Sequence, residues 1–198
     1  MKDIDLFKET LKKEGEALIE NSSHFTGDIE KAIELISKVK GKLIVIAVGK
    51  SGHIGKKIAA TMSSTGTPAF FIHADEAAHG DLGMITKDDV TLLISNSGET
   101  PEVLNIIPNL NKIGVKIISI TGNKESSLSK QSDVSLSYSY KEECDDLHLA
   151  PTISSTLTLA FGDALAVVLS KKKNFTKEDF HLYHPGGSLG KKLSDKNA

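Results

Sequence analysis

The sequence contains no arginine, so all 24 basic residues among its 198 are lysines. Any anion-binding site must therefore use lysine ammonium groups, hydroxyls, backbone N–H groups and helix N-termini. Tryptophan is absent and aromatic residues make up only 5% of the chain, which leaves little material for stacking nucleic-acid bases. Because the net charge is −2 and the lysines are scattered among acidic residues, we expect no nucleic-acid partner.

Cysteine is nearly absent too, since Cys144 stands alone and excludes a disulfide framework within the chain. A single cysteine is typical of a reducing compartment, and the charged N-terminus lacks a signal-peptide pattern. No uninterrupted run of about 18 apolar residues occurs, so we expect no membrane-spanning helix and no membrane partner. These features predict a cytoplasmic protein.

Apolar, β-branched runs alternate with amphipathic stretches along the chain, as in a parallel sheet covered by helices. Strands are predicted at 43–48, 69–72, 90–94, 115–120 and, at an edge, 134–138. Helical periodicity occurs at 5–21, 28–40, 50–62, 101–110 and 152–170. We therefore expect an α/β fold: a three-layer αβα sandwich around a five-stranded parallel sheet, of flavodoxin-like type.

The length fits one domain over residues 1–198, which would bury about two-thirds of its unfolded surface. We expect N-terminal helices at 1–40, an α/β core at 41–173 and a polar, glycine-rich tail at 174–198.

Two polar loops follow predicted strands, where open parallel sheets bind ligands. The first, GKSGHIG at 49–55, lacks the glycine spacing of both the Walker loop and the dinucleotide fingerprint. Lys50 is a point charge suited to a phosphate or a developing oxyanion. A tight strand–helix turn with an exposed lysine is the alternative interpretation.

The second loop, SNSGET at 95–100, places the hydroxyls of Ser95, Ser97 and Thr100 at one strand end. Gly98 permits close backbone approach, and a helix starting at about Pro101 favours an anion through its dipole. These features predict a phosphate-binding loop built without arginine. The alternative is an Asn/Ser/Gly turn followed by a helix cap.

These two loops, VGKSGHIG at 48–55 and SNSGET at 95–100, resemble the signature loops of the sugar isomerase (SIS) domain family. Three further motifs resemble its D-arabinose 5-phosphate isomerases of the 3-deoxy-D-manno-octulosonate (Kdo) pathway: AAHGDLG at 77–83, LAPT at 149–152 with SST at 154–156, and HPGG at 184–187. Many such relatives carry a pair of cystathionine-β-synthase-type (CBS) domains after the isomerase domain, and we expect this chain to lack that pair.

The resemblance implies an isomerase that interconverts D-arabinose 5-phosphate and D-ribulose 5-phosphate through an enediol(ate), the first step of Kdo synthesis for lipopolysaccharide. The reaction needs a carbon base, an acid/base for ring opening, a phosphate anchor and stabilisation of the enediolate, but no cofactor. Two alternatives stay open: another SIS isomerase, such as one for sedoheptulose 7-phosphate, and a non-catalytic phosphosugar sensor. Sensors usually carry a DNA-binding domain, and the first 40 residues lack a basic recognition helix.

By the same resemblance, Glu102 is the proton shuttle between C1 and C2, and His184 is the acid/base for ring opening or oxygen proton transfer. Lys50 and Glu143 complete the expected catalytic set. Each has an ordinary alternative: Glu102 as a helix-terminal acid, His184 as a solvated loop histidine without a packing role, and Glu143 as part of a solvated acidic run.

Seven residues are expected to bind the substrate or its phosphate: Gly49, Ser51, His79, Ser95, Asn96, Ser97 and Thr100. His79 is also a second candidate for ring opening. Pairs such as His79 with Asp81 or His181 with His184 lack the spacing of a dedicated metal site. We expect no required metal, although His79 could bind zinc adventitiously. The remaining histidines, His148 among them, are interpreted as structural.

The predicted helix at 152–170 is apolar nearly all round, so it must be covered on most sides. SIS domains resemble one another in forming dimers or dimers of dimers with sites at the seams. We therefore expect a homotetramer in which His184 reaches the site that holds Glu102 of a neighbouring chain.

Overall fold

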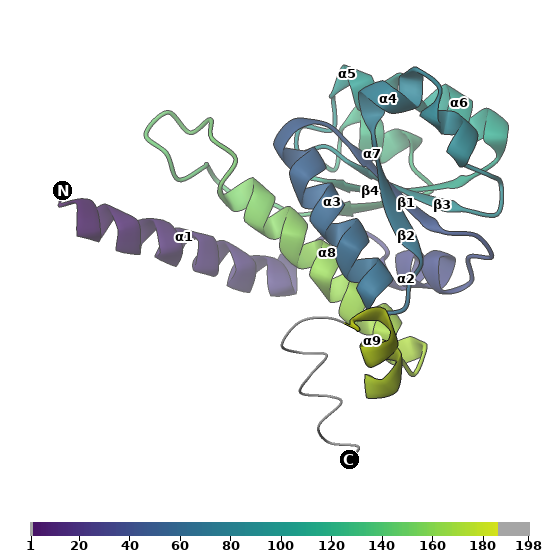
Figure 1. Cartoon of the computed structure of the whole chain (residues 1–198). Coiled ribbons are helices and arrows are strands. Elements are labelled where there is room, and N and C mark those ends of the chain that lie inside the picture. The colour runs from purple at the N-terminus through teal and green to yellow at the C-terminus, as the bar shows by residue number, and fades with distance from the viewer. Residues whose placement is uncertain (1, 186–198) are drawn as a thin grey trace, which may run out of the picture.

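The computed structural model describes residues 2–185 (Figure 1). Its single sheet has five parallel strands in the order β2-β1-β3-β4-β5. The strands are β1 (Leu43–Ala47), β2 (Ala69–His73), β3 (Val90–Ile94), β4 (Lys116–Thr121) and β5 (Val134–Ser137). This order is that of doubly wound, flavodoxin-like sheets, so the predicted sheet is confirmed.

Helices cover both faces of the sheet. One face carries α1 (Asp3–His24), α2 (Ile29–Ser37), α3 (Gly49–Ser64) and α8 (Ile153–Lys172). The other carries α4 (Ala74–Ala78), α5 (Pro101–Leu104), α6 (Ile107–Ile113) and α7 (Ser127–Gln131). Because alternate strand residues point to opposite faces, Leu43 and Val45 pack with the first group while Ile44 and Ile46 pack with the second. The predicted three-layer sandwich is thereby confirmed.

The first helix, α1, lies alongside α8, and its N-terminal part extends away from the sheet (Figure 1). Only Ala17 and Asn21 of α1 are buried. Several large apolar side chains of α1 are exposed: Ile4, Leu6, Phe7, Leu11 and Ile19. A single chain therefore leaves much of the apolar surface of α1 uncovered.

The helix predicted at 101–110 is broken in two. The structure has α5 and α6 in its place, separated at Asn105 and Ile106. Pro108 is the physical reason, because proline lacks the N–H that would donate to the carbonyl of Leu104 and its ring clashes with that group. The two pieces bury Val103 and Leu110 as the apolar pattern predicts.

The polar tail also contains a helix that its composition did not indicate, α9 (Lys177–Tyr183). Thr176 and Asp179 form a capping box at its start, with side chain and backbone bonded reciprocally. A short 3₁₀ helix, η1 (Asp81–Met84), follows α4. Residues 186–198 of the predicted tail lie outside the described residues.

Helix α8 is long and apolar enough to cross a membrane by length and composition alone. We expected no such segment, because the chain has no long uninterrupted apolar run. A helix can reach a high mean hydropathy without such a run. In the fold α8 packs against α3, α1 and α2. A Cβ at Gly162 would overlap the side chain of Ile58 on α3, so the two helices are in close contact. A core helix packed in this way can be as apolar as a membrane-spanning helix.

Candidate active site

The two polar loops lie side by side at the carboxyl edge of the sheet. Strand β1 pairs with β3, with Ile46 opposite Leu93, so the segments that follow these strands are neighbours. The chain winds from β1 toward β2 on one side and from β3 toward β4 on the other. The loops therefore flank the topological switch point, where doubly wound sheets bind their ligands.

The first loop leads directly into a long helix, since α3 begins at Gly49 and has 16 residues with no acid in its first turn. Its N-terminus, with Lys50 exposed and Ser51 half-buried, presents N–H groups and positive charge at the switch point. Lys50, Ser51 and Asn96 line a small cavity of about 50 Å³ together with the start of α8. The structure thus brings these three predicted residues together.

In the second loop, hydroxyl groups hold one another in place. The buried Ser95 has its Oγ 2.7 Å from Thr100 Oγ1 and accepts a hydrogen bond from the backbone nitrogen of Gly98 at 3.0 Å. Ser97 is exposed, and its hydroxyl accepts from the Glu99 backbone nitrogen. The helix that follows has only four residues, so its dipole is weaker than the sequence pattern suggested. The anion-favouring helix terminus belongs instead to the first loop.

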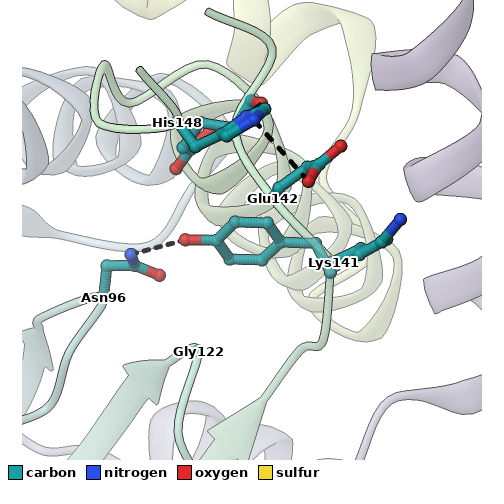
Figure 2. Close-up of a pocket in the computed structure, with 7 residues that line it drawn as sticks. Asn96, Gly122, Lys141, Glu142 and His148 are labelled. Atoms are coloured by element: carbon teal, nitrogen blue, oxygen red, sulfur yellow. Dashed lines mark hydrogen bonds and ion pairs between the residues drawn. The ribbon is translucent and has the colours of Figure 1, made fainter. Parts of the chain in front are cut away.

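A larger cavity of about 390 Å³ adjoins this loop (Figure 2). Its lining comes from three parts of the chain: Asn96, Gly122, and the segment after β5 with Tyr140, Lys141, Glu142, Glu143 and His148. Asn96 lines both cavities. The sequence pattern does not indicate Tyr140 as a site residue, and His148 is among the histidines interpreted as structural. Side chains alternate in direction along β5, and the same alternation continued past its end places Tyr138 and Tyr140 on the same side of the chain. This pattern could have indicated the two tyrosines as a pair.

Glu143 is buried, which contradicts the alternative interpretation of this residue as part of a solvated acidic run. Its Oε2 accepts hydrogen bonds from the backbone and hydroxyl of Thr152, both at 2.9 Å, and from the Ser154 backbone at 3.3 Å. Burial acts to raise the pKa of Glu143, but the donors on Ser154 and Thr152 outweigh it and the net shift is downward. Glu143 is thus an ionised carboxylate at the N-terminus of α8, beside the larger cavity.

Glu102 and His79 are exposed and come from adjoining short helices, since α5 packs against α4 and His79 ends α4. Neither is among the residues that line the two cavities above. Both lie on the sheet face opposite α3 and α8. A single chain therefore places Glu102 beside the loop at 95–100 without enclosing it.

His184 lies far from these loops within one chain. It ends α9, which follows α8, whereas the site lies at the start of α8 (Figure 1). A helix of 20 residues is about 30 Å long. The His184 ring stacks on Phe180 at a centroid distance of 3.9 Å, and its Nδ1 lies 2.8 Å from the Phe180 carbonyl oxygen. The expectation that this histidine has no packing role was wrong.

Within residues 2–185, no group of three or more His, Cys, Asp or Glu side chains is close enough to hold a metal ion. The positions considered for metal pairs, His79 with Asp81 and His181 with His184, lie in this range. The arrangement instead offers lysine, hydroxyl and carboxylate groups around an anion-favouring helix terminus, which suits acid/base chemistry on a phosphorylated substrate.

Comparisons with known proteins agree with this geometry. The SIS domain family matches residues 35–168. Arabinose 5-phosphate isomerase KdsD of Pseudomonas aeruginosa is 54% identical over 166 residues, which are 84% of this chain and 51% of that protein. KdsD of Escherichia coli K12 is 52% identical over 186 residues, 94% of this chain and 57% of that protein.

The chain spans about half the length of these curated relatives. A solved structure of an E. coli CFT073 protein in complex with arabinose 5-phosphate is 47% identical, with a TM-score of 0.88, and covers 93% of this chain and 100% of that one. With the family match extending over most of the sequence, the chain belongs to the SIS domain family.

Proposed function

We propose that this protein is an aldose–ketose isomerase that interconverts D-arabinose 5-phosphate and D-ribulose 5-phosphate through an enediol(ate). The observation that carries the proposal is the meeting of Lys50 and Ser51 with the Ser95–Thr100 loop at the switch point of the sheet. This choice of substrate is supported by the similarity to the E. coli CFT073 protein whose structure was solved in complex with arabinose 5-phosphate, since the match covers all of that chain.

The phosphate is anchored by the hydroxyls of Ser51, Ser95, Ser97 and Thr100 and by the N-terminus of α3. Gly49 has a φ of 57° and opens that helix, and Asn96 lies between the two cavities. Hydroxyls and N–H groups bind the dianion without arginine, as the composition requires. Lys50, at the same helix end, stabilises the negative charge that develops on the enediolate oxygen.

Glu102 carries the proton between C1 and C2. It directly follows the phosphate loop and is ionisable and exposed, so it can reach a substrate held there. Glu143 adds a negative charge to the lining of the adjoining cavity. His79, at the end of the neighbouring helix α4, binds the substrate. The chemistry is acid/base throughout and needs no cofactor or metal.

His184 acts from a neighbouring subunit in a homotetramer. Two observations support this assembly: the distance between His184 and the site within one chain, and the exposed apolar side chains of α1. An apolar groove of about 290 Å³ between α1 and α8, with Leu18 and Phe161 in its lining, adds to the surface that a second subunit can cover. The names of the relatives support a place at the start of Kdo synthesis. The single cysteine of the chain supports a reducing compartment, the cytoplasm.

The test is a coupled assay of purified protein with arabinose 5-phosphate, sedoheptulose 7-phosphate and unphosphorylated D-arabinose. We expect turnover of arabinose 5-phosphate, and kcat/KM for the free sugar lower by a factor of about 1,000 or more, because phosphate binding energy orients the reacting carbons. Preference for the seven-carbon ketose, or comparable use of the free sugar, would overturn the assignment.

A further inference from the structure

The side chain of Asn96 is bonded on both sides by tyrosines that the proposed mechanism does not use. Its Nδ2 donates to the Tyr140 hydroxyl at 2.7 Å, a bond visible in Figure 2, and its Oδ1 accepts from the Tyr138 hydroxyl at 3.0 Å. Tyr138 is buried and also lies 3.0 Å from Thr158 Oγ1 on α8. The amide of the phosphate loop is thus tied to the segment after β5.

The orientation of this amide matters because Asn96 lines both the small cavity with Lys50 and Ser51 and the larger one with Glu143. The terminal torsion of an asparagine is broad and roughly two-fold, so hydrogen bonds decide which way the amide faces. Its backbone is already held, since the Asn96 carbonyl accepts from Gly122 and Thr121. The side-chain bonds therefore select one rotamer on a fixed backbone.

The two tyrosines differ in their surroundings. Burial raises the pKa of Tyr138 well above its ordinary value, and burial also raises that of Tyr140, where the Glu143 carboxylate raises it further. Both phenols are therefore neutral at neutral pH. Tyr140 is half-buried and lines the larger cavity, whereas Tyr138 lies in the core. Of these two partners of the amide, Tyr140 is therefore the one that bonds it at the lining of the larger cavity.

We propose that Tyr140 is a positioning residue for the phosphosugar site, because its hydroxyl holds Nδ2 of Asn96 so that the amide keeps one orientation between the two cavities. The inference rests on the proposed function. It assigns Tyr140 no contact with reacting atoms, so its influence on catalysis must pass through Asn96.

Tyr140→Phe removes the hydroxyl and keeps the ring. One neutral hydrogen bond corresponds to a factor of about two to ten, so we expect KM for arabinose 5-phosphate to rise about fivefold while kcat changes less than twofold. In an Asn96→Ala background the same change should have no further effect. Ser139→Ala is the matched control. Ser139 lies between the two tyrosines in the sequence, its side chain is exposed, and its backbone is held by Asn21.

An unchanged KM in Tyr140→Phe, or effects of Tyr140→Phe and Asn96→Ala that multiply, would overturn the proposal. The Asn96 side-chain amide resonance in the ligand-free protein should also shift in Tyr140→Phe and not in Ser139→Ala. Calorimetric binding of arabinose 5-phosphate to the same variants in a Glu102→Gln background, where turnover is slowed, repeats the comparison for binding. A wild type that binds this sugar without converting it would overturn the isomerase function alone, and one that neither binds nor converts it would overturn both proposals.

Discussion

The Oε2 atom of Glu143 lies 2.9 Å from both the backbone nitrogen and the hydroxyl oxygen of Thr152. Thr152 immediately precedes α8, so this buried carboxylate satisfies N–H groups that a helix start leaves without intrahelical partners. Its negative charge also complements the positive end of the α8 dipole. Glu143, which we expect to be catalytic, thus also links the segment after β5 to the start of α8.

Replacing Glu143 by Gln keeps the shape but removes the charge from these hydrogen bonds. We expect the free energy of unfolding to fall by about 1–3 kcal/mol, the range for charge-assisted hydrogen bonds to a buried group. Glu142→Gln is the matched control, because Glu142 is only part-buried and lies 3.8 Å from His148. It should change the free energy by less than about 0.5 kcal/mol. Equal losses in the two variants, measured by urea denaturation, would contradict the capping role.

The same carboxylate predicts a pH dependence. The net pKa of Glu143 is lowered in the fold, so its stabilisation is present above the unfolded pKa of about 4.3 and is lost as pH falls through the folded pKa. Wild type should therefore exceed Glu143→Gln in stability at pH 7, and the difference should vanish in acid. Denaturation series from pH 7 to about pH 3 measure it. A difference that stays constant across this range would show that ionisation of Glu143 does not matter.

Two loop glycines offer a second comparison. Both have positive φ, 68° at Gly98 and 57° at Gly49, but a Cβ at Gly98 would overlap the Ser126 side chain while one at Gly49 would meet open space. Gly49→Ala should cost about 1 kcal/mol of stability from backbone strain. Gly98→Ala adds overpacking and should cost about 3 kcal/mol. Thermal unfolding that ranks the two variants equally would mean that the loop can move away from Ser126.

The strands could be predicted because their local composition reports burial. In β1, all five residues Leu43–Ala47 are buried, and a continuous β-branched run is typical of a strand covered on both faces. Helix α8 was predictable for a similar reason. The break between α5 and α6 was also encoded, by Pro108, although the apolar pattern of Val103 and Leu110 continued across it.

The environment of Glu143 was not encoded locally. Three other acids lie within three residues of it, so composition indicates a solvated run, while its burial depends on N–H groups nine and eleven residues away. The bond from Asn96 to Tyr140 joins residues 44 apart. Such partners are decided by how β3, β5 and α8 pack, and only the fold brings them together.

Glu102 is the residue on which the proposed chemistry depends most. Glu102→Gln keeps the size of the side chain but removes its basicity, so kcat should fall by about 100-fold or more with little change in KM. Exchange of the substrate C–H proton with solvent deuterium should slow in parallel. If that exchange continues at the wild-type rate, another residue is the base, and Glu143 is the next candidate. The stability of the variant should match wild type, since Glu102 is exposed.

The placement of His184 leads to the last prediction, which concerns the sharing of sites between subunits. Within one chain His184 ends α9, which lies at the opposite end of the fold from α5, the helix that carries Glu102 (Figure 1). If each site takes Glu102 from one chain and His184 from another, an inactive Glu102→Gln chain and an inactive His184→Ala chain can repair one another. A site that draws both residues from one chain offers no such repair.

Mixing the two inactive variants under conditions that allow subunit exchange should therefore restore activity toward arabinose 5-phosphate. In a mixed pair one site combines both lesions, while the other receives native Glu102 from one chain and native His184 from the other. Exchange is confirmed independently by mass spectrometry of differently labelled subunits. If exchange occurs and the mixture stays inactive, every site keeps a lesion, and His184 must then reach Glu102 within its own chain by a rearrangement of α9.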